Sequence, residues 1–241
     1  MNFSFKLPSL FIIFLLLTAC SNNKVRIVHY NIKELNTLKI DDLKNEQILN
    51  VQKVLEQHPF DILSLNEIQF DQENIPNKKA NTRGMNLTKL KKILDVEEYQ
   101  ETFHRANTGK SAKRNEAGDF YLQANTKESR RHADQVNFGV FPAQYSTGAI
   151  FKYDIISAII LNTLTWKKFN PAINLKKYKS AKGLPLPTKM ELFDKNFSDV
   201  VIDINGHQVH LILLHTVPSY HFGNKKSPNY VRNRDQLRFL E

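Results

Sequence analysis

The order of strand and helix patterns along this chain predicts an α/β fold, a four-layer α/β sandwich of two mixed, largely antiparallel sheets packed face to face with helices outside. Two observations lead to this prediction. In the first part of the chain, apolar runs of strand length alternate with stretches of helical periodicity. In the second half, strand-like runs follow one another with loops between them. Helix-covered strands followed by antiparallel strands can bury their apolar faces if the two sheets share a core.

The first part of the chain contains two strand–helix pairs. A β-branched run at 25–32 predicts a strand, and apolar residues at helical spacing predict a helix over 41–58. A second strand is expected at 61–67 and a second helix around 87–94. The segment 107–137 is polar with few periodic apolar positions, which predicts a long loop or insertion.

The second half is rich in strands. Four strand-like runs are expected, at 148–153, 155–161, 199–204 and 208–215. The last two are joined by Asn205-Gly206, a strong signal for a β-hairpin. A lysine- and proline-containing loop is expected at 169–196, and a helical piece at 233–241.

The N-terminus has the pattern of a targeting signal. Lys6 precedes an apolar stretch at 10–17 that is too short to span a bilayer as a helix. The stretch ends in Leu17-Thr18-Ala19-Cys20, which resembles the lipobox of bacterial lipoproteins, and Cys20 is the one cysteine in the chain. We therefore expect a signal peptide at 1–19, a lipidated tether at 20–24 and one domain at 25–241. This predicts an extracytoplasmic protein of the cell envelope, periplasmic or on the outer surface, with an acylated Cys20 as membrane anchor.

The charge of the chain indicates anionic partners only weakly. Lys and Arg number 34 against 24 Asp and Glu, a formal net charge of +10 at pH 7. Such an excess favours phosphate-rich ligands or anionic membranes. The lysines are spread along the chain, and no basic stripe with interleaved aromatic residues supports a nucleic-acid-binding module. No protein partner can be inferred.

Three polar residues stand at or near the ends of predicted strands. Alternation along a strand places Asn31 on the face of Ile27 and His29, Glu67 on the face of Leu63 and Leu65, and His215 on the face of Leu211 and Leu213. Each would then end an apolar face, where a buried polar group needs a partner. Glu and Asn oxygens suit a hard ion such as Mg²⁺, and a nearby His can bind a phosphate or transfer a proton. We expect Glu67 and His215 to lie close together, within about 10 Å, with Asn31 nearby.

The sequence around these residues resembles the endonuclease/exonuclease/phosphatase superfamily. The similar segments are Ile27-Val28-His29-Tyr30-Asn31-Ile32, Asp61-Ile62-Leu63-Ser64-Leu65-Asn66-Glu67-Ile68, Phe141-Pro142-Ala143-Gln144-Tyr145 with the strand after it, Val209-His210-Leu211-Ile212-Leu213-Leu214-His215-Thr216, and Arg232-Asn233-Arg234-Asp235-Gln236-Leu237. The resemblance covers nearly the whole chain after the tether. It implies a Mg²⁺-dependent phosphoesterase, with Mn²⁺ as the alternative ion.

The resemblance also implies roles for particular residues. Glu67 would bind the metal, and Asn31 would help to hold the metal or its water. Tyr145 would touch the phosphate, with Gln144 beside it in substrate binding, and His215 would hydrogen-bond the scissile phosphate oxygen. The substrate is a phosphate ester of undetermined class, since superfamilies of this kind select substrates by their loops.

The sequence departs from the family pattern at its end. The family continues with a Gly-Asp-x-Asn strand and a Ser-Asp-His strand, and neither follows Glu241. We therefore expect a domain that is incomplete at the C-terminus and inactive in this form. A non-catalytic surface lipoprotein that uses the sandwich as a binding module is the alternative. A smaller departure is Asn196-Phe197-Ser198-Asp199, where a bacterial subgroup carries a His and an aromatic residue before the Asp.

Overall fold

The structure is a computed structural model that describes residues 24–180, 182–220 and 223–241. The expected signal peptide and Cys20 lie outside the described residues, so the anchor stays a prediction. No helix in the described ranges is long and apolar enough to cross a membrane.

The first sheet has four strands in the order β1-β2-β4-β3. Strand β1 (Ile27–Leu35) pairs in parallel with β2 (Ile62–Ile68), and β2 pairs antiparallel with β4 (Ser146–Phe151). Strand β3 (Gln100–His104) forms the other edge, antiparallel to β4. The parallel pair is possible because a crossover containing a helix lies between β1 and β2.

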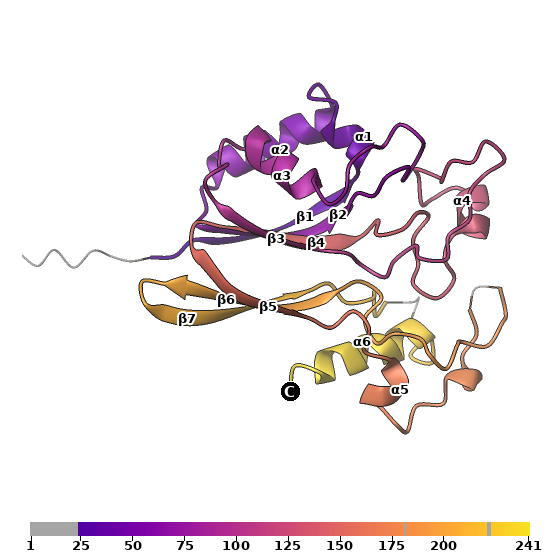
Figure 1. Cartoon of the computed structure of the whole chain (residues 1–241). Helices are drawn as coiled ribbons and strands as arrows, with labels where there is room; N and C mark the ends of the chain where they lie inside the picture. The colour runs from indigo at the N-terminus through magenta and orange to yellow at the C-terminus, as the bar shows by residue number, and fades with distance from the viewer. Residues whose placement is uncertain (1–23, 181, 221–222) are drawn as a thin grey trace, which may run out of the picture.

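Two amphipathic helices cover the outer face of the first sheet (Figure 1). They are α2 (Glu46–Gln57) and α3 (Asn86–Ile93). The Asn45 side chain caps α2 by accepting a hydrogen bond from the Gln47 N–H, which explains why this helix begins at Glu46 and not at 41. Beneath them lies a core of apolar residues from both helices and from the strands, comprising Ile32, Leu35, Ile40, Ile48, Val51, Leu55, Leu63, Leu65, Ile68, Leu87, Leu90 and Ile150.

The second sheet is a three-stranded antiparallel meander. It consists of β5 (Asp154–Ile160), β6 (Phe197–Ile204) and β7 (His207–Leu214). The expectation of two mixed sheets is therefore wrong for this one. The predicted hairpin is confirmed, because Asn205 and Gly206 have φ values of 55° and 84° and join β6 to β7, as a tight hairpin turn requires.

Figure 1 shows the two sheets edge-on, one above the other. They pack against each other through a shared core. Its buried members come from β2, β4, β6 and β7 and are Ile62, Ala149, Phe151, Val200, Ile202 and Leu213. On the opposite face of the second sheet, Ile159 and Ile212 are paired to Asp199 and are exposed. Helix α6 (Pro228–Arg238) packs where β6 begins and β7 ends. The outer helical layer therefore covers this sheet at one end only.

Short helices lie in the segments that connect the strands and the longer helices. They are α1 (Thr37–Ile40), α4 (Lys127–His132), α5 (Trp166–Phe169) and the 3₁₀-helix η1 (Leu175–Lys177). The two long loops expected from the sequence thus contain only single helical turns. Helix α6 begins at Pro228, earlier than expected, because the Ser227 hydroxyl accepts a hydrogen bond from the Tyr230 N–H and proline fits the first helical turn.

Candidate functional site

The ends of β1 and β2 meet at a corner of unusual backbone geometry. Lys33, Glu34 and Glu67 have φ values of 55°, 59° and 65°, in the left-handed region that residues other than glycine seldom adopt. The pairing register of β1 with β2 shifts between Asn31 and Leu35, and that of β2 with β4 shifts between Asn66 and Ile68. Bulges of this kind turn side chains out of the regular alternation, and strained backbone collects at functional sites.

The bulge in β2 changes the direction of Glu67. Leu63 and Leu65 pack under the helices, so strict alternation would place Glu67 there too. Instead, its carboxylate Oε1 accepts a 2.9 Å hydrogen bond from Nδ2 of Asn31. The left-handed residue interrupts the alternation, and the expected shared face of Glu67 with Leu63 and Leu65 is therefore wrong.

Asn31 itself lies on a polar face of β1. Ile27 on that face is 57% exposed and His29 is exposed, whereas Val28, Tyr30 and Ile32 contribute to the helix-covered core. The expectation that Asn31 ends an apolar core face is therefore wrong. The Oδ1 atom of Asn31 accepts the Lys33 N–H at 2.9 Å, which fixes the amide so that its NH₂ group faces Glu67.

The structure brings His215 to Glu67 from the other sheet. His215 follows the last residue of β7, and its Nε2 lies 3.8 Å from Glu67 Oε1. Its Nδ1 is buried and has no hydrogen-bond partner among the described residues. Burial, and secondly the charge of Lys195, lower the pKa of His215 to about 4. The imidazole is therefore neutral at pH 7 and is a weak base there.

Tyr145 lies next to the carboxylates of Glu34 and Glu67. Its hydroxyl donates a 3.0 Å hydrogen bond to Glu34 Oε1, and burial together with Glu34 and Glu67 raises the pKa of the phenol. Gln144 is buried beneath it: its Oε1 accepts the Val140 N–H at 2.7 Å, and its Nε2 has no partner among the described residues. The phosphate contact of Tyr145 and the substrate contact of Gln144 stay predictions.

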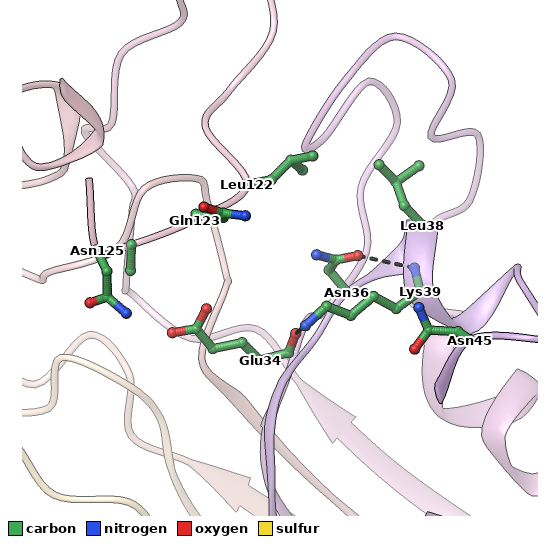
Figure 2. A pocket seen from close by; sticks show the side chains of 9 residues that line it. Glu34, Asn36, Leu38, Lys39, Asn45, Leu122, Gln123 and Asn125 are labelled. Atoms are coloured by element: carbon green, nitrogen blue, oxygen red, sulfur yellow. Dashed lines mark hydrogen bonds between the residues drawn. The ribbon is translucent and has the colours of Figure 1, made fainter. Parts of the chain in front are cut away.

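A cavity of about 590 Å³ opens at this corner. Its lining includes Glu34, Glu67, Tyr145 and His215, together with apolar side chains such as Val136, Leu186 and Met190. Glu34 also lines a smaller neighbouring pocket of about 430 Å³, where Figure 2 shows it with the amide side chains of Gln123 and Asn125. Sequence reasoning did not find Glu34, because nothing in its neighbourhood distinguishes it from a surface carboxylate.

A buried ion pair also lines the cavity. Asp194 and Lys195 are almost fully buried, and Lys195 Nζ donates to Asp194 Oδ2 at 2.9 Å. Burial opposes ionisation of Asp194, but the charges of Lys195 and Arg232 outweigh it and lower its pKa to about 2. Sequence reasoning assigned this segment to a loop, and adjacent Asp and Lys residues in a loop give no signal of burial.

Glu67 offers the candidate site a carboxylate that could hold a divalent cation. Within the described ranges, no group of three or more His, Cys, Asp or Glu residues could hold a metal ion. Mg²⁺ is bound in proteins through one or two carboxylates, with waters and substrate phosphates as the other ligands. Glu67, held by Asn31 at the edge of a cavity, fits that requirement. The metal-binding roles of Glu67 and Asn31 stay predictions.

No protein-family model matches the sequence, and no curated protein matches it. The structure matches solved structures of endonuclease/exonuclease/phosphatase-fold proteins. One from Beutenbergia cavernae is 14% identical, with a TM-score of 0.47 over 90% of this chain and 43% of that chain. One from Leptotrichia buccalis is 9% identical, with a TM-score of 0.43 over 90% and 62%. A β-hairpin deletion mutant of beta toxin from Staphylococcus aureus is 14% identical, with a TM-score of 0.42 over 91% and 61%. The chain thus spans roughly half the length of the proteins that it matches.

Proposed function

We propose that this chain belongs to a Mg²⁺-dependent phosphoesterase of the cell envelope, anchored to the membrane through Cys20. One observation carries the catalytic part of the proposal. Glu67 from the first sheet and His215 from the second lie 3.8 Å apart at the edge of a cavity, where the backbone of Glu67 is strained. Strained backbone beside paired titratable groups in a cavity is typical of active sites.

Glu67, His215 and Tyr145 would each have a different role in phosphoester hydrolysis. Glu67 would hold the ion, with Asn31 orienting its carboxylate, and a bound Mg²⁺ supplies charge stabilisation at the phosphate. Neutral His215 has one N–H, which would hydrogen-bond a phosphate oxygen. The Tyr145 hydroxyl, now donating to Glu34, is a donor that can turn to the phosphate.

The proposal concerns the whole protein, since this chain covers about half of the proteins that it matches. The test is hydrolysis of nucleic acid, sphingomyelin and sugar-phosphate substrates by the product of the complete gene, with Mg²⁺ and with a chelator. We expect turnover of one class that the chelator abolishes. Chelator-resistant turnover would contradict the mechanism, and a folded but inactive protein would favour the binding-module alternative.

Two pairs of variants locate the site. Glu67→Gln should lower the rate by at least about 10- to 100-fold, because it removes the charge that binds the metal. His215→Ala should lower it by about 10²- to 10⁴-fold, as for an acid–base or oxyanion-stabilising group. Glu73→Gln and His210→Ala are matched controls on exposed side chains outside the cavity, and should keep the rate. If the control variants lowered the rate as much as the site variants do, the assignment of Glu67 and His215 to the active site would be refuted.

A further inference from the structure

Lys195 is a buried lysine beside the candidate site. Only 7% of its side chain is exposed, yet it lines the same cavity as Glu67 and His215. It directly precedes the buried Asn196, whose amide donates to Thr147 Oγ1 of the first sheet at 2.5 Å. The backbone that carries Lys195 is therefore fixed at the junction of the two sheets.

The ammonium group of Lys195 has more N–H donors than it has acceptors nearby among the described residues. It donates to Asp194 Oδ2 at 2.9 Å and makes a long contact of 3.5 Å with the carbonyl oxygen of Thr216, next to His215. An ammonium group has three N–H donors. Lys195 Nζ has two acceptors among the described residues, so its third N–H has none. Lys195 also lines the cavity.

The surroundings keep Lys195 in place. Asp194 is held on its other oxygen, Oδ1, by the Gln236 amide at 3.2 Å, and its charge is also attracted by buried Arg232. The Asp194 carboxylate thus attracts both Lys195 and Arg232, and Arg232 is attracted as well by Glu191 and Asp134. Buried ion pairs add little to stability once desolvation is counted, so stability alone does not explain a charged pair at a cavity wall.

We propose that Lys195 is an anion-binding residue of this cavity, and that its remaining N–H donates to a phosphate oxygen of the ligand beside His215. This inference rests on the proposed function, because it names a group that would bind the phosphate of the ester. Asp194 acts as the positioning residue that orients the ammonium group. A compact ammonium charge suits a phosphate oxygen without requiring a fixed planar geometry.

Binding of inorganic phosphate to the purified protein tests the proposal. Calorimetry is done with a chelator present and at constant ionic strength, so that neither bound metal nor catalysis is needed. Lys195→Met, which keeps the length of the side chain and removes the charge, should weaken phosphate binding by about 10-fold or more. Lys179→Met is the matched control, since Lys179 lines the same cavity but is exposed; phosphate affinity should stay within about 2-fold of wild type.

The outcomes separate the two proposals. Unchanged phosphate binding in a folded Lys195→Met protein, or equal loss in Lys179→Met, would overturn the inference and leave the pair with a structural role. The same conclusion would follow if the wild type did not bind phosphate. If Lys195→Met does not fold, Lys195→Gln retains a donor for Asp194 without the charge and should show the same loss. Phosphate binding that depends on Lys195 in a protein without hydrolytic activity would support this inference while refuting the proposed function.

Discussion

Arg232 of α6 provides a strong test of how the C-terminal helix is held in this fold. Arg232 is 1% exposed, and its guanidinium group makes four hydrogen bonds. Its acceptors are the carbonyl oxygens of Leu192, Val136 and Glu191, at 3.0, 3.2 and 2.7 Å, and Asn137 Oδ1 at 2.7 Å. One side chain thus connects α6 to two loops that border the cavity.

Replacing Arg232 with Met should strongly destabilise the protein. The substitution removes the donor from four acceptors and takes one of the two cations from buried Asp194. Breaking a buried, hydrogen-bonded charge arrangement by removing one partner costs about 3–5 kcal/mol. Arg232→Lys keeps the charge but not the planar fork of donors, so we expect a smaller loss of about 1–3 kcal/mol.

Urea denaturation followed by circular dichroism measures the free energy of unfolding. The slope with urea should stay unchanged, so that a lower midpoint reports stability alone. Arg234→Met is the control on the same helix. The Arg234 side chain is 56% exposed and its nearest carboxylate contact is 3.5 Å, so the change should be within about 0.5 kcal/mol. A loss below about 1 kcal/mol for Arg232→Met, or one equal to that of Arg234→Met, would refute the view that Arg232 anchors α6.

Three further predictions concern the anchor, acid stability and the sheet junction. Metabolic labelling with a clickable fatty acid should mark the wild type and leave Cys20→Ser unlabelled; equal labelling would rule out the lipid anchor. Because the folded-state pKa of Asp194 is about 2, below its ordinary value of 3.8, its ionisation stabilises the fold above pH 3.8, and this contribution is lost as pH falls through that window. The difference in unfolding free energy between the wild type and Asp194→Asn should therefore narrow on acidification, and a constant difference would contradict the assignment. Asn196→Ala should cost about 1–3 kcal/mol in the same urea assay, because Thr147 loses a buried partner, whereas Asn50→Ala, at an exposed position, should cost less.

The sequence by itself determined the elements whose local signals agree with their environment. The helices around Val51 and Leu90 follow from apolar spacing, and the β6–β7 hairpin follows from Asn205-Gly206, whose left-handed geometry few other residues accept. Strand β3 was missed because its sequence, Gln100–His104, is mostly polar; pairing with β4, a tertiary interaction, makes it a strand. The sequence also proposed Glu67 and His215 as candidates that lie close together, and the structure places their side chains 3.8 Å apart; their roles stay predictions.

Only the tertiary structure decided how those candidates meet. Alternation along a strand assumes a regular pleat, and the bulge at Glu67 breaks it, so the carboxylate reaches Asn31 from the face that alternation excluded. Glu34 and Lys195 belong to the cavity because loop and strand ends far apart in the chain converge on His215 and Tyr145. A side chain acquires such a role from burial and from neighbours distant in sequence, and neither is encoded in the residues next to it.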